Sequence, residues 1–527
     1  MTATATEPAL ALKSAQGRGV LAATILGSGV AALDATVVNV ALPRIGEDLH
    51  AGLTALQWTL NAYSLTLAGL LLLGGSLGDR MGRRRIFVFG VIWFTAASVG
   101  CALAPGDEVL IAMRALQGIG AALLTPGSLA ILEAVFRRDD RAAAVGAWSG
   151  LGGVATAIGP VVGGLLVGVA PWGWRLVFLI NLPLAAAVIY LSVRYIPETR
   201  DEQAEGRLDV PGAVLAAAGL ALVVYGLTEG PRLGWTMVPA GCLAAGVVVL
   251  VAFVVVEARS RSPMMPLSLF RSRNFTAANI VTLTVYAALS GAFFLLPLQL
   301  QRVAGFSPVA AGSALLPVTA VMLVLSARMG RLAQRIGPRW PMTIGPLVAA
   351  VGLAMYVRIG ADASYLADVL PQVLIFGLGL SITVAPLTAT VLAAAPRHQV
   401  GVASAVNNDV ARAAGLLAVA VLPALAGITD STYNNPAEFS AGFHHAVLIC
   451  AGLCALGGVL SALFISGDVE AVGAARDEDP AALQRTCAVT APHARPAVTV
   501  GCRDGSAGAG RQLLGDGGSP DAGTVPG

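Results

Sequence analysis

Long apolar runs recur along most of this chain, and they constrain its fold more than any other feature. Each run has about the length that a helix needs to cross the hydrocarbon core of a bilayer, roughly 20 residues. Charged residues make up only 12% of the 527 residues, against about 25% in soluble domains. Fourteen runs qualify, at 19–42, 55–77, 86–104, 109–132, 142–168, 176–196, 209–229, 236–256, 275–298, 307–327, 340–359, 365–390, 401–425 and 443–465. The sequence therefore predicts an all-α polytopic membrane protein.

The arginines predict how these spans are oriented, because basic residues gather in cytoplasmic loops. With the N-terminus inside, the inner loops hold nineteen arginines and the outer loops or helix ends hold five. Arginine also replaces lysine almost throughout, which is typical of a GC-rich bacterial genome. We therefore expect a bacterial cell-membrane protein with both termini in the cytoplasm.

The sequence lacks the signatures of several function classes. Lys13 is the only lysine and lies in a polar N-terminal segment, so the chain has no Walker A loop for ATP. The cysteines and histidines show no metal-ligand spacing, and the loops are too short for a soluble catalytic domain. The N-terminus has no basic region with a cleavage site, so the first run is a true span. We expect no enzyme activity, no metal or other cofactor and no nucleic-acid partner.

An internal repeat indicates how the spans are grouped. The stretch "GSLGDRMGRR" at 75–84 and the stretch "GRLAQRIGPR" at 330–339 share five residues at a constant offset of 255. The first copy follows the second run and the other copy follows the tenth. A simple repeat of six spans would place the second copy after the eighth run. Its position after the tenth run predicts two extra spans between the halves. Chance similarity between two short loops rich in glycine and arginine is the alternative.

This plan divides the chain into five segments. They are a cytoplasmic tail (1–18), an N-terminal six-helix bundle (19–206), two linker helices (207–265), a C-terminal six-helix bundle (266–466) and a second cytoplasmic tail (467–527). The last segment is rich in Gly, Ala, Pro and Asp without amphipathic periodicity, which predicts disorder.

Five motifs, in order, carry a resemblance to a known family. They are "LDATVVNVALP" (33–43), "GSLGDRMGRRR" (75–85), "LIAMRALQGIGAA" (110–122), "GLGGVATAIGPVVGGLL" (150–166) and "WRLVFLINLP" (174–183). Together they resemble the major facilitator superfamily, and within it the fourteen-helix drug:proton antiporter branch of EmrB/QacA-type multidrug exporters. The resemblance spans about residues 18–466.

This resemblance implies an exporter that works by alternating access. It would exchange amphipathic or cationic small molecules for protons, with the proton gradient as its energy source, and would function as a monomer in the bilayer. A proton-coupled symporter for a nutrient or metabolite is the alternative within the same fold. A channel or receptor would leave the repeat unexplained.

Asp34 is a single carboxylate in the apolar first run, which makes it a candidate proton carrier. Burial favours the neutral form of a carboxyl group, so such a group can load and release a proton as its surroundings change. Arg114 on the fourth run comes out at the same depth, about 10–12 Å from the outer end at 1.5 Å per residue, so the two could meet. The resemblance assigns this arginine to proton coupling. A structural hydrogen bond of Asp34 and a static ion pair are the alternatives.

Two motifs are expected to control the gap between the bundles. The loop after the second run is a gating candidate, in which Asp79 would face a helix N-terminus or a nearby arginine. The fifth run removes side chains where bundles would touch, and the resemblance ties this motif to exporters; ordinary small-residue packing is the alternative. The gating set is Gly75, Gly78, Asp79, Arg80, Gly82, Arg83 and Arg84, and the antiporter set is Gly159, Pro160, Gly163 and Gly164.

Polar residues on the thirteenth run are the remaining candidates. Asp409 and Arg412 at i, i+3 either neutralise each other within the helix or make Asp409 a second proton-coupling site. The candidates for the substrate cavity are Tyr63, Gln117, Asn407, Asn408 and Arg412.

Overall fold

The computed structural model describes residues 10–200, 209–260, 263–396 and 399–467. Within these ranges thirteen helices are long and apolar enough to cross a membrane. Helix α2 (Leu53–Met81) is the fourteenth candidate span. Its two segments are bent by 50° relative to each other, and together they are long and apolar enough to cross a membrane. The predicted helical class and span number therefore agree with the structure. The predicted disordered tail (467–527) lies outside the described residues, except for residue 467. Residues 1–9 of the other predicted tail, and the predicted inner-loop residues Arg207, Arg261 and Arg397, also lie outside them.

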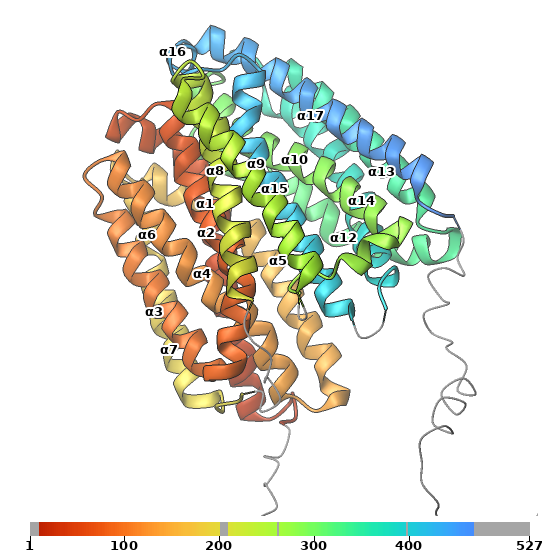
Figure 1. Cartoon of the computed structure of the whole chain (residues 1–527). Coiled ribbons are helices and arrows are strands. Elements are labelled where there is room, and N and C mark those ends of the chain that lie inside the picture. Colours follow the sequence, from red (N-terminus) through yellow and green to blue (C-terminus); the bar gives the residue numbers. More distant parts are fainter. Residues whose placement is uncertain (1–9, 201–208, 261–262, 397–398, 468–527) are drawn as a thin grey trace, which may run out of the picture. The chain divides into compact units, whose positions relative to one another are not determined.

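Six spans, with α6 and α7 counted as one, form the N-terminal bundle, which Figure 1 shows in red to yellow. Helix α4 packs against α1, α2 and α3, and α1 also packs against α5 and α7. The short helix α6 and helix α7 together make the sixth span. The bounds are α1 (Ala15–Leu49), α2 (Leu53–Met81), α3 (Arg83–Ala102), α4 (Asp107–Val135), α5 (Arg138–Gly168), α6 (Trp174–Leu179) and α7 (Asn181–Tyr195).

Six more spans form the C-terminal bundle, in which α13 packs against α14 and α17, and α10 packs against α15 and α17. Short turns η1 (Leu267–Arg271), η2 (Tyr356–Arg358) and η3 (Tyr365–Val369) adjoin these helices. The bounds are α10 (Arg273–Arg302), α11 (Pro308–Ser313), α12 (Leu316–Ile336), α13 (Arg339–Met355), α14 (Leu370–Ala393), α15 (Val400–Leu425), α16 (Asp430–Tyr433) and α17 (Pro436–Phe464).

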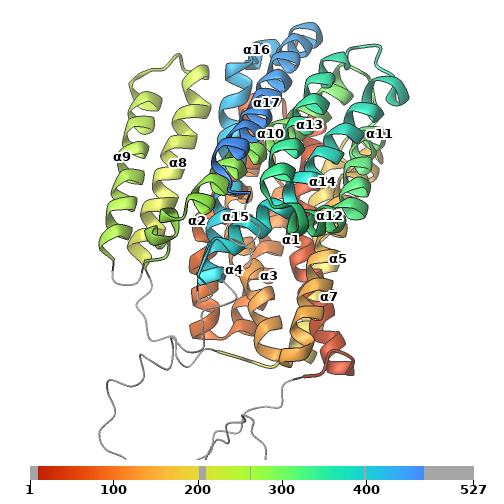
Figure 2. The ribbon, with the colours of Figure 1, turned by 90° about the vertical axis from the view of Figure 1, so that its right-hand side faces the viewer.

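Two helices between the bundles, α8 (Val210–Arg232) and α9 (Met237–Arg259), pack against each other. Helix α8 also contacts α2 of the first bundle and α15 of the second (Figure 2). Its Glu229 accepts a hydrogen bond from the indole of Trp58 at 2.9 Å and pairs with Arg232 at 2.6 Å. The exact boundaries of the five predicted segments stay a prediction.

The two bundles share a packing detail that supports the sequence repeat. A Cβ on Gly120 of α4 would lie 2.6 Å from the backbone nitrogen of Phe94 in α3, so the two helices cross at backbone contact. In the second bundle, Gly379 of α14 contacts the backbone of Ala349 in α13 in the same way. Ala349 follows Phe94 by 255 residues, the offset of the two loop motifs.

We expect Gly120→Val to destabilise the protein, because the new side chain meets backbone atoms of Phe94 that cannot turn away. Overpacking of this kind costs about 1–3 kcal/mol. Thermal unfolding of the purified protein in detergent measures the effect. Gly452→Val is the matched control, since it lies inside α17 and a Cβ there meets nothing within 4 Å; equal melting temperatures for the two variants would contradict the close crossing.

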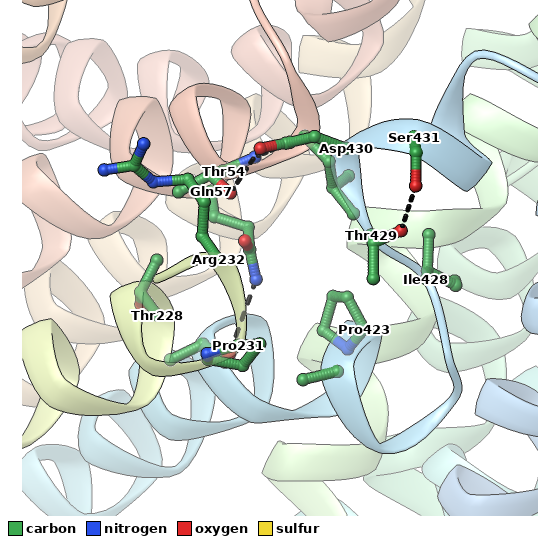
Figure 3. Close-up of a pocket in the computed structure, with 13 residues that line it drawn as sticks. Thr54, Gln57, Thr228, Pro231, Arg232, Pro423, Ile428, Thr429, Asp430 and Ser431 are labelled. Carbon is green, nitrogen blue, oxygen red and sulfur yellow. Dashed lines mark hydrogen bonds between the residues drawn. The ribbon is translucent and has the colours of Figure 1, made fainter. Parts of the chain in front are cut away.

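The bundles touch at the end that holds the C-terminus of α1, which the arginine pattern places outside and which we call the outer end. Thr54 donates to Asp430 from its backbone nitrogen at 3.0 Å and from its hydroxyl at 3.1 Å (Figure 3). Gln57 donates to the Val419 carbonyl at 2.6 Å. That carbonyl has no helical donor because Pro423, four residues later, lacks an N–H.

The side-chain hydrogen bonds between the two bundles lie in their outer halves, among the described residues. Besides Thr54–Asp430 and Gln57–Val419, the Gln301 amide donates to the Val40 carbonyl at 3.0 Å. We therefore call this conformation outer-closed.

Candidate functional site

A buried polar network lies in the N-terminal bundle around Asp34. An Asp34 carboxylate oxygen and the Arg114 guanidinium are 2.6 Å apart, and the two side chains are 0% and 1% exposed. Gln117 joins both partners, because its Nε2 donates to Asp34 at 2.9 Å and its Oε1 accepts from Arg114 at 2.6 Å. The Arg114 Nε donates to the carbonyl of Thr59 at 3.0 Å. The predicted meeting of Asp34 and Arg114 is confirmed; the role of the pair in proton coupling stays a prediction.

Asn181 at the start of α7 belongs to this network, and sequence reasoning did not single it out. Its Nδ2 donates to Asp34 at 3.1 Å and to the hydroxyl of Ser98 at 2.9 Å. Asn181 is fully buried. The available signal was an amide in the otherwise apolar stretch "FLINLP" (178–183), because a polar side chain in a span is expensive unless it has partners. Asp34 thus accepts hydrogen bonds from α4 and α7 together.

Tyr63 separates the network from the space between the bundles. Its ring centre lies 4.3 Å from the Arg114 guanidinium carbon, within the range of a cation–π contact. The residue is 2% exposed and lines a cavity on its other side. Any movement of Tyr63 would therefore change the contact between the cavity and the ion pair.

The cavity consists of two adjoining chambers of about 380 and 350 Å³. Both are lined by Ala35, Thr36 and Arg412. The volumes are typical of small-molecule sites, which are mostly apolar with few polar groups. The first chamber draws residues from both bundles, among them Asn61, Ser64, Tyr286, Ser290, Phe293, Phe294 and Asn408. The second lies mostly within the N-terminal bundle and includes Ser28, Tyr63, Thr125, Trp148 and Thr156.

The structure corrects two of the five predicted cavity residues. Tyr63, Asn408 and Arg412 line the chambers, and their contact with a substrate stays a prediction. Gln117 is fully buried in the Asp34 network instead. Asn407 turns toward α10, where it donates to Asn279 and Thr282. In both cases the helix face that carries the amide meets a neighbouring helix of its own bundle.

Asp409 and Arg412 do not form an ion pair within 4.0 Å in the part of the chain that the structure describes, so the local pair expected at i, i+3 is absent. Arg412 lines the cavity, whereas Oδ1 of Asp409 is buried without a hydrogen-bond partner. A proton-coupling role for Asp409 stays a prediction.

The gating loop closes on its own bundle in this conformation. Asp79 pairs with Arg83 at 2.8 Å, which is the nearby-arginine option. Arg84 lies 3.6 Å from Glu198, just beyond α7, and donates to the Ile196 carbonyl at 3.1 Å. Glycine is required at position 82, where φ is +110°.

Three further residues of the predicted gating set, Gly75, Gly78 and Arg80, lie on α2. A Cβ at Gly75 would meet Pro126 of α4 at 3.5 Å, and one at Gly78 meets open space. Arg80 lies in the last turn of α2. Asp79, Arg83 and Arg84 thus make their ion pairs within the N-terminal bundle, and the gating role of the loop stays a prediction.

The α5 motif contacts both bundles at the outer end. Gly159 and Gly163 face α1, where a Cβ on Gly163 would lie 2.7 Å from a methyl carbon of Val37. Gly164 faces α11, and its Cβ would lie 2.5 Å from the Pro308 carbonyl oxygen. The Pro160 carbonyl is met in turn by Gly312 of α11. Gly164 and Pro160 thus form a contact between the bundles, as expected; the link to export direction stays a prediction.

The comparisons with known proteins identify the family. The model of the Major Facilitator Superfamily matches residues 24–420. The chain belongs to this superfamily of membrane transporters. The chain is similar to the multidrug resistance protein Stp of Mycobacterium tuberculosis, with 37% identity over 390 residues that cover 74% of this chain and 72% of that protein.

Two further comparisons agree with the superfamily assignment. A methylenomycin A resistance protein of Streptomyces coelicolor is 37% identical over 443 residues, covering 83% of this chain and 90% of that protein. The crystal structure of a bacterial homologue of the lysosomal transporter Spinster has a TM-score of 0.64 at 17% identity, covering 89% of this chain and 99% of that one. The major facilitator fold, with two extra central helices, is therefore shown.

Among the described residues no group of three or more His, Cys, Asp or Glu side chains is arranged to hold a metal ion. The buried network offers one carboxylate, Asp34, beside Arg114, and proton transfer through it stays a prediction. The adjoining chambers can hold an organic molecule.

Proposed function

We propose that this major facilitator chain is a secondary active exporter that exchanges amphipathic small molecules for protons by alternating access. It acts in the bacterial cell membrane as a monomer, with both termini cytoplasmic, and the proton gradient is its energy source. The observation that carries the proposal is the Asp34–Arg114 pair, buried directly behind a wall of the cavity.

The outer-closed conformation corresponds in this proposal to the state after proton release, in which Asp34 pairs with Arg114 and accepts bonds from Gln117 and Asn181. When the cavity opens outward, a proton from outside neutralises Asp34 and removes the attraction that holds Arg114. A buried pair that loses one charge is strongly destabilised. Protonation therefore weakens the hold on Arg114, which is left with the Thr59 carbonyl and the Gln117 amide oxygen, and this is the step that rearranges the network in the proposal.

A chain of contacts leads from Asp34 to the outer closure. Thr36 and Val37 follow Asp34 on α1 and contact Gly159 and Gly163 of α5. The next residue, Gly164, contacts α11 of the other bundle. A shift of α1 on protonation of Asp34 would thus act on the contact that closes the outer end.

The direction of proton flow tests the proposal. In inverted membrane vesicles acidified inside, methylenomycin A added to the medium should raise the internal pH, as followed by an acridine dye. An exporter that exchanges substrate for protons carries the compound in and protons out. A symporter would carry both in the same direction and would not dissipate the gradient. Empty-vector vesicles are the control, and further antibiotics and dyes extend the panel.

A further inference from the structure

Arg412 places a positive charge in the cavity without a direct ion pair, although Asp409, three residues earlier on α15, interacts with it electrostatically over a longer distance. Arg412 lines both chambers and stays charged at physiological pH. No carboxylate lies within 4.0 Å of its guanidinium among the described residues. It is also the only Asp, Glu, Lys or Arg among the residues that line the two chambers. A charged residue at this depth is expensive, and its partner is therefore informative.

A second donor without a partner faces the same space from the other bundle. Asn61 on α2 lines the first chamber and is 1% exposed, and its Nδ2 has no hydrogen-bond acceptor. The Nδ2 of the neighbouring cavity amide Asn408, in contrast, donates to the Ser404 carbonyl. A buried amide N–H group without a partner costs about 1–3 kcal/mol. The guanidinium of Arg412, which has no carboxylate within 4.0 Å, and the unpaired amide nitrogen of Asn61 would both be stabilised by an acceptor.

The nearby carboxylates do not supply this acceptor. Asp34 is bound to Arg114 and fully buried behind Tyr63. Asp409 lies outside the lining of the chambers, and its buried Oδ1 makes no hydrogen bond. The aromatic rings of Tyr286, Phe293 and Phe294 provide an apolar wall beside the charge.

We propose that the first chamber binds amphipathic molecules that carry an anionic oxygen group, such as a carboxylate or phenolate, held by Arg412 and Asn61. Arg412 comes from the C-terminal bundle and Asn61 from the N-terminal bundle, so the anionic group bridges the two halves. This inference names the substrate class and in that respect rests on the proposed function. It also replaces the cationic substrates that the family resemblance implies, because a lone guanidinium repels them.

Three fluorescent probes with one ring system test the charge preference. The full-length protein in phosphatidylcholine nanodiscs is titrated with 9-anthracenecarboxylate, 9-anthracenemethanol and 9-anthracenemethylammonium at one pH and without a proton gradient. We expect the carboxylate to bind at least about tenfold more tightly than the other two, as one charge-assisted hydrogen bond allows. Tighter binding of the ammonium probe would overturn the proposal.

Two variants locate the site. Arg412→Gln should weaken the carboxylate about tenfold or more and change the affinity for the alcohol about twofold or less. Asn61→Asp keeps the shape of the side chain, replaces the donor with a like charge, and should weaken only the carboxylate. Equal loss for all three probes in both variants would mean that these residues only shape the cavity, and the proposal would then be wrong.

The binding and transport measurements can contradict the anion site and the proton-exchange mechanism independently of each other. Carboxylate binding that follows the expected pattern, without substrate-driven proton movement in vesicles, would remove the exchange mechanism and leave the anion site in place. Proton exchange driven by the ammonium probe but not by the carboxylate would leave the exchange mechanism and overturn the anion site.

Discussion

Asp34→Asn is expected to abolish substrate-driven proton movement and to lower the stability of the protein. The variant cannot exchange a proton at this position, and it leaves the Arg114 guanidinium, 1% exposed, without its counter-ion. Removing one partner of a buried ion pair costs about 3–5 kcal/mol. Vesicle pH measurements report the first effect, and thermal unfolding in detergent reports the second.

The double variant Asp34→Asn with Arg114→Gln separates coupling from stability. It removes both charges, so we expect it to recover most of the lost stability, because no uncompensated charge stays buried. Proton coupling should stay absent. If the double variant instead transports with normal coupling, the pair is a static structural feature and the proton passes elsewhere. Asp34→Glu keeps the charge and should retain part of the activity.

The helical class, the number of spans and the depth of the buried ion pair could be predicted from the sequence. Runs of about 20 apolar residues are obligatory in a bilayer, so the spans are visible directly. The depth of Asp34 and Arg114 could be compared because the rise per residue of a helix is fixed. The offset of 255 between two loops predicted the repeat, and the structure adds that Phe94 and Ala349, at the same offset, each meet a glycine of the neighbouring helix.

The orientation of side chains around each helix could not be obtained in the same way. Asn407 and Asn408 are adjacent and equally polar, yet the first bonds to α10 and the second faces the cavity. Which face of a span meets the cavity depends on neighbours that are distant in sequence. Asn181 was missed for the same reason, since its partners Asp34 and Ser98 lie on other helices.

The outer closure gives the second large expected effect. Gly164→Val places a side chain against backbone atoms of α11, since even the Cβ would lie 2.5 Å from the Pro308 oxygen and 2.7 Å from the Val309 Cα. This contact exists only while the bundles touch, so the clash penalises the outer-closed state alone. Overpacking by about 3 kcal/mol would shift the balance toward the outer-open state by roughly 100-fold. Transport should fall accordingly, while the fold is retained.

Two neighbouring glycines make the test specific. Gly168→Val lies one turn later on the same face, where the Cβ would be 3.7 Å from a Val309 methyl carbon, an ordinary contact. It should therefore behave like the wild type. Gly163→Val clashes with Val37 inside the N-terminal bundle, a contact that does not depend on the gap between the bundles, and should lower the melting temperature instead.

Labelling from outside reports the state of the closure directly. A single cysteine at Asn39, which lines the cavity on α1, is introduced into a chain whose native cysteines are replaced, and whole cells are exposed to a membrane-impermeant maleimide. We expect slow labelling in the wild-type background and with Gly168→Val, and rapid labelling with Gly164→Val. Slow labelling with normal transport in Gly164→Val would show that α5 and α11 can separate and close around a larger side chain. Rapid labelling would identify the contact between α5 and α11 as part of the outer gate.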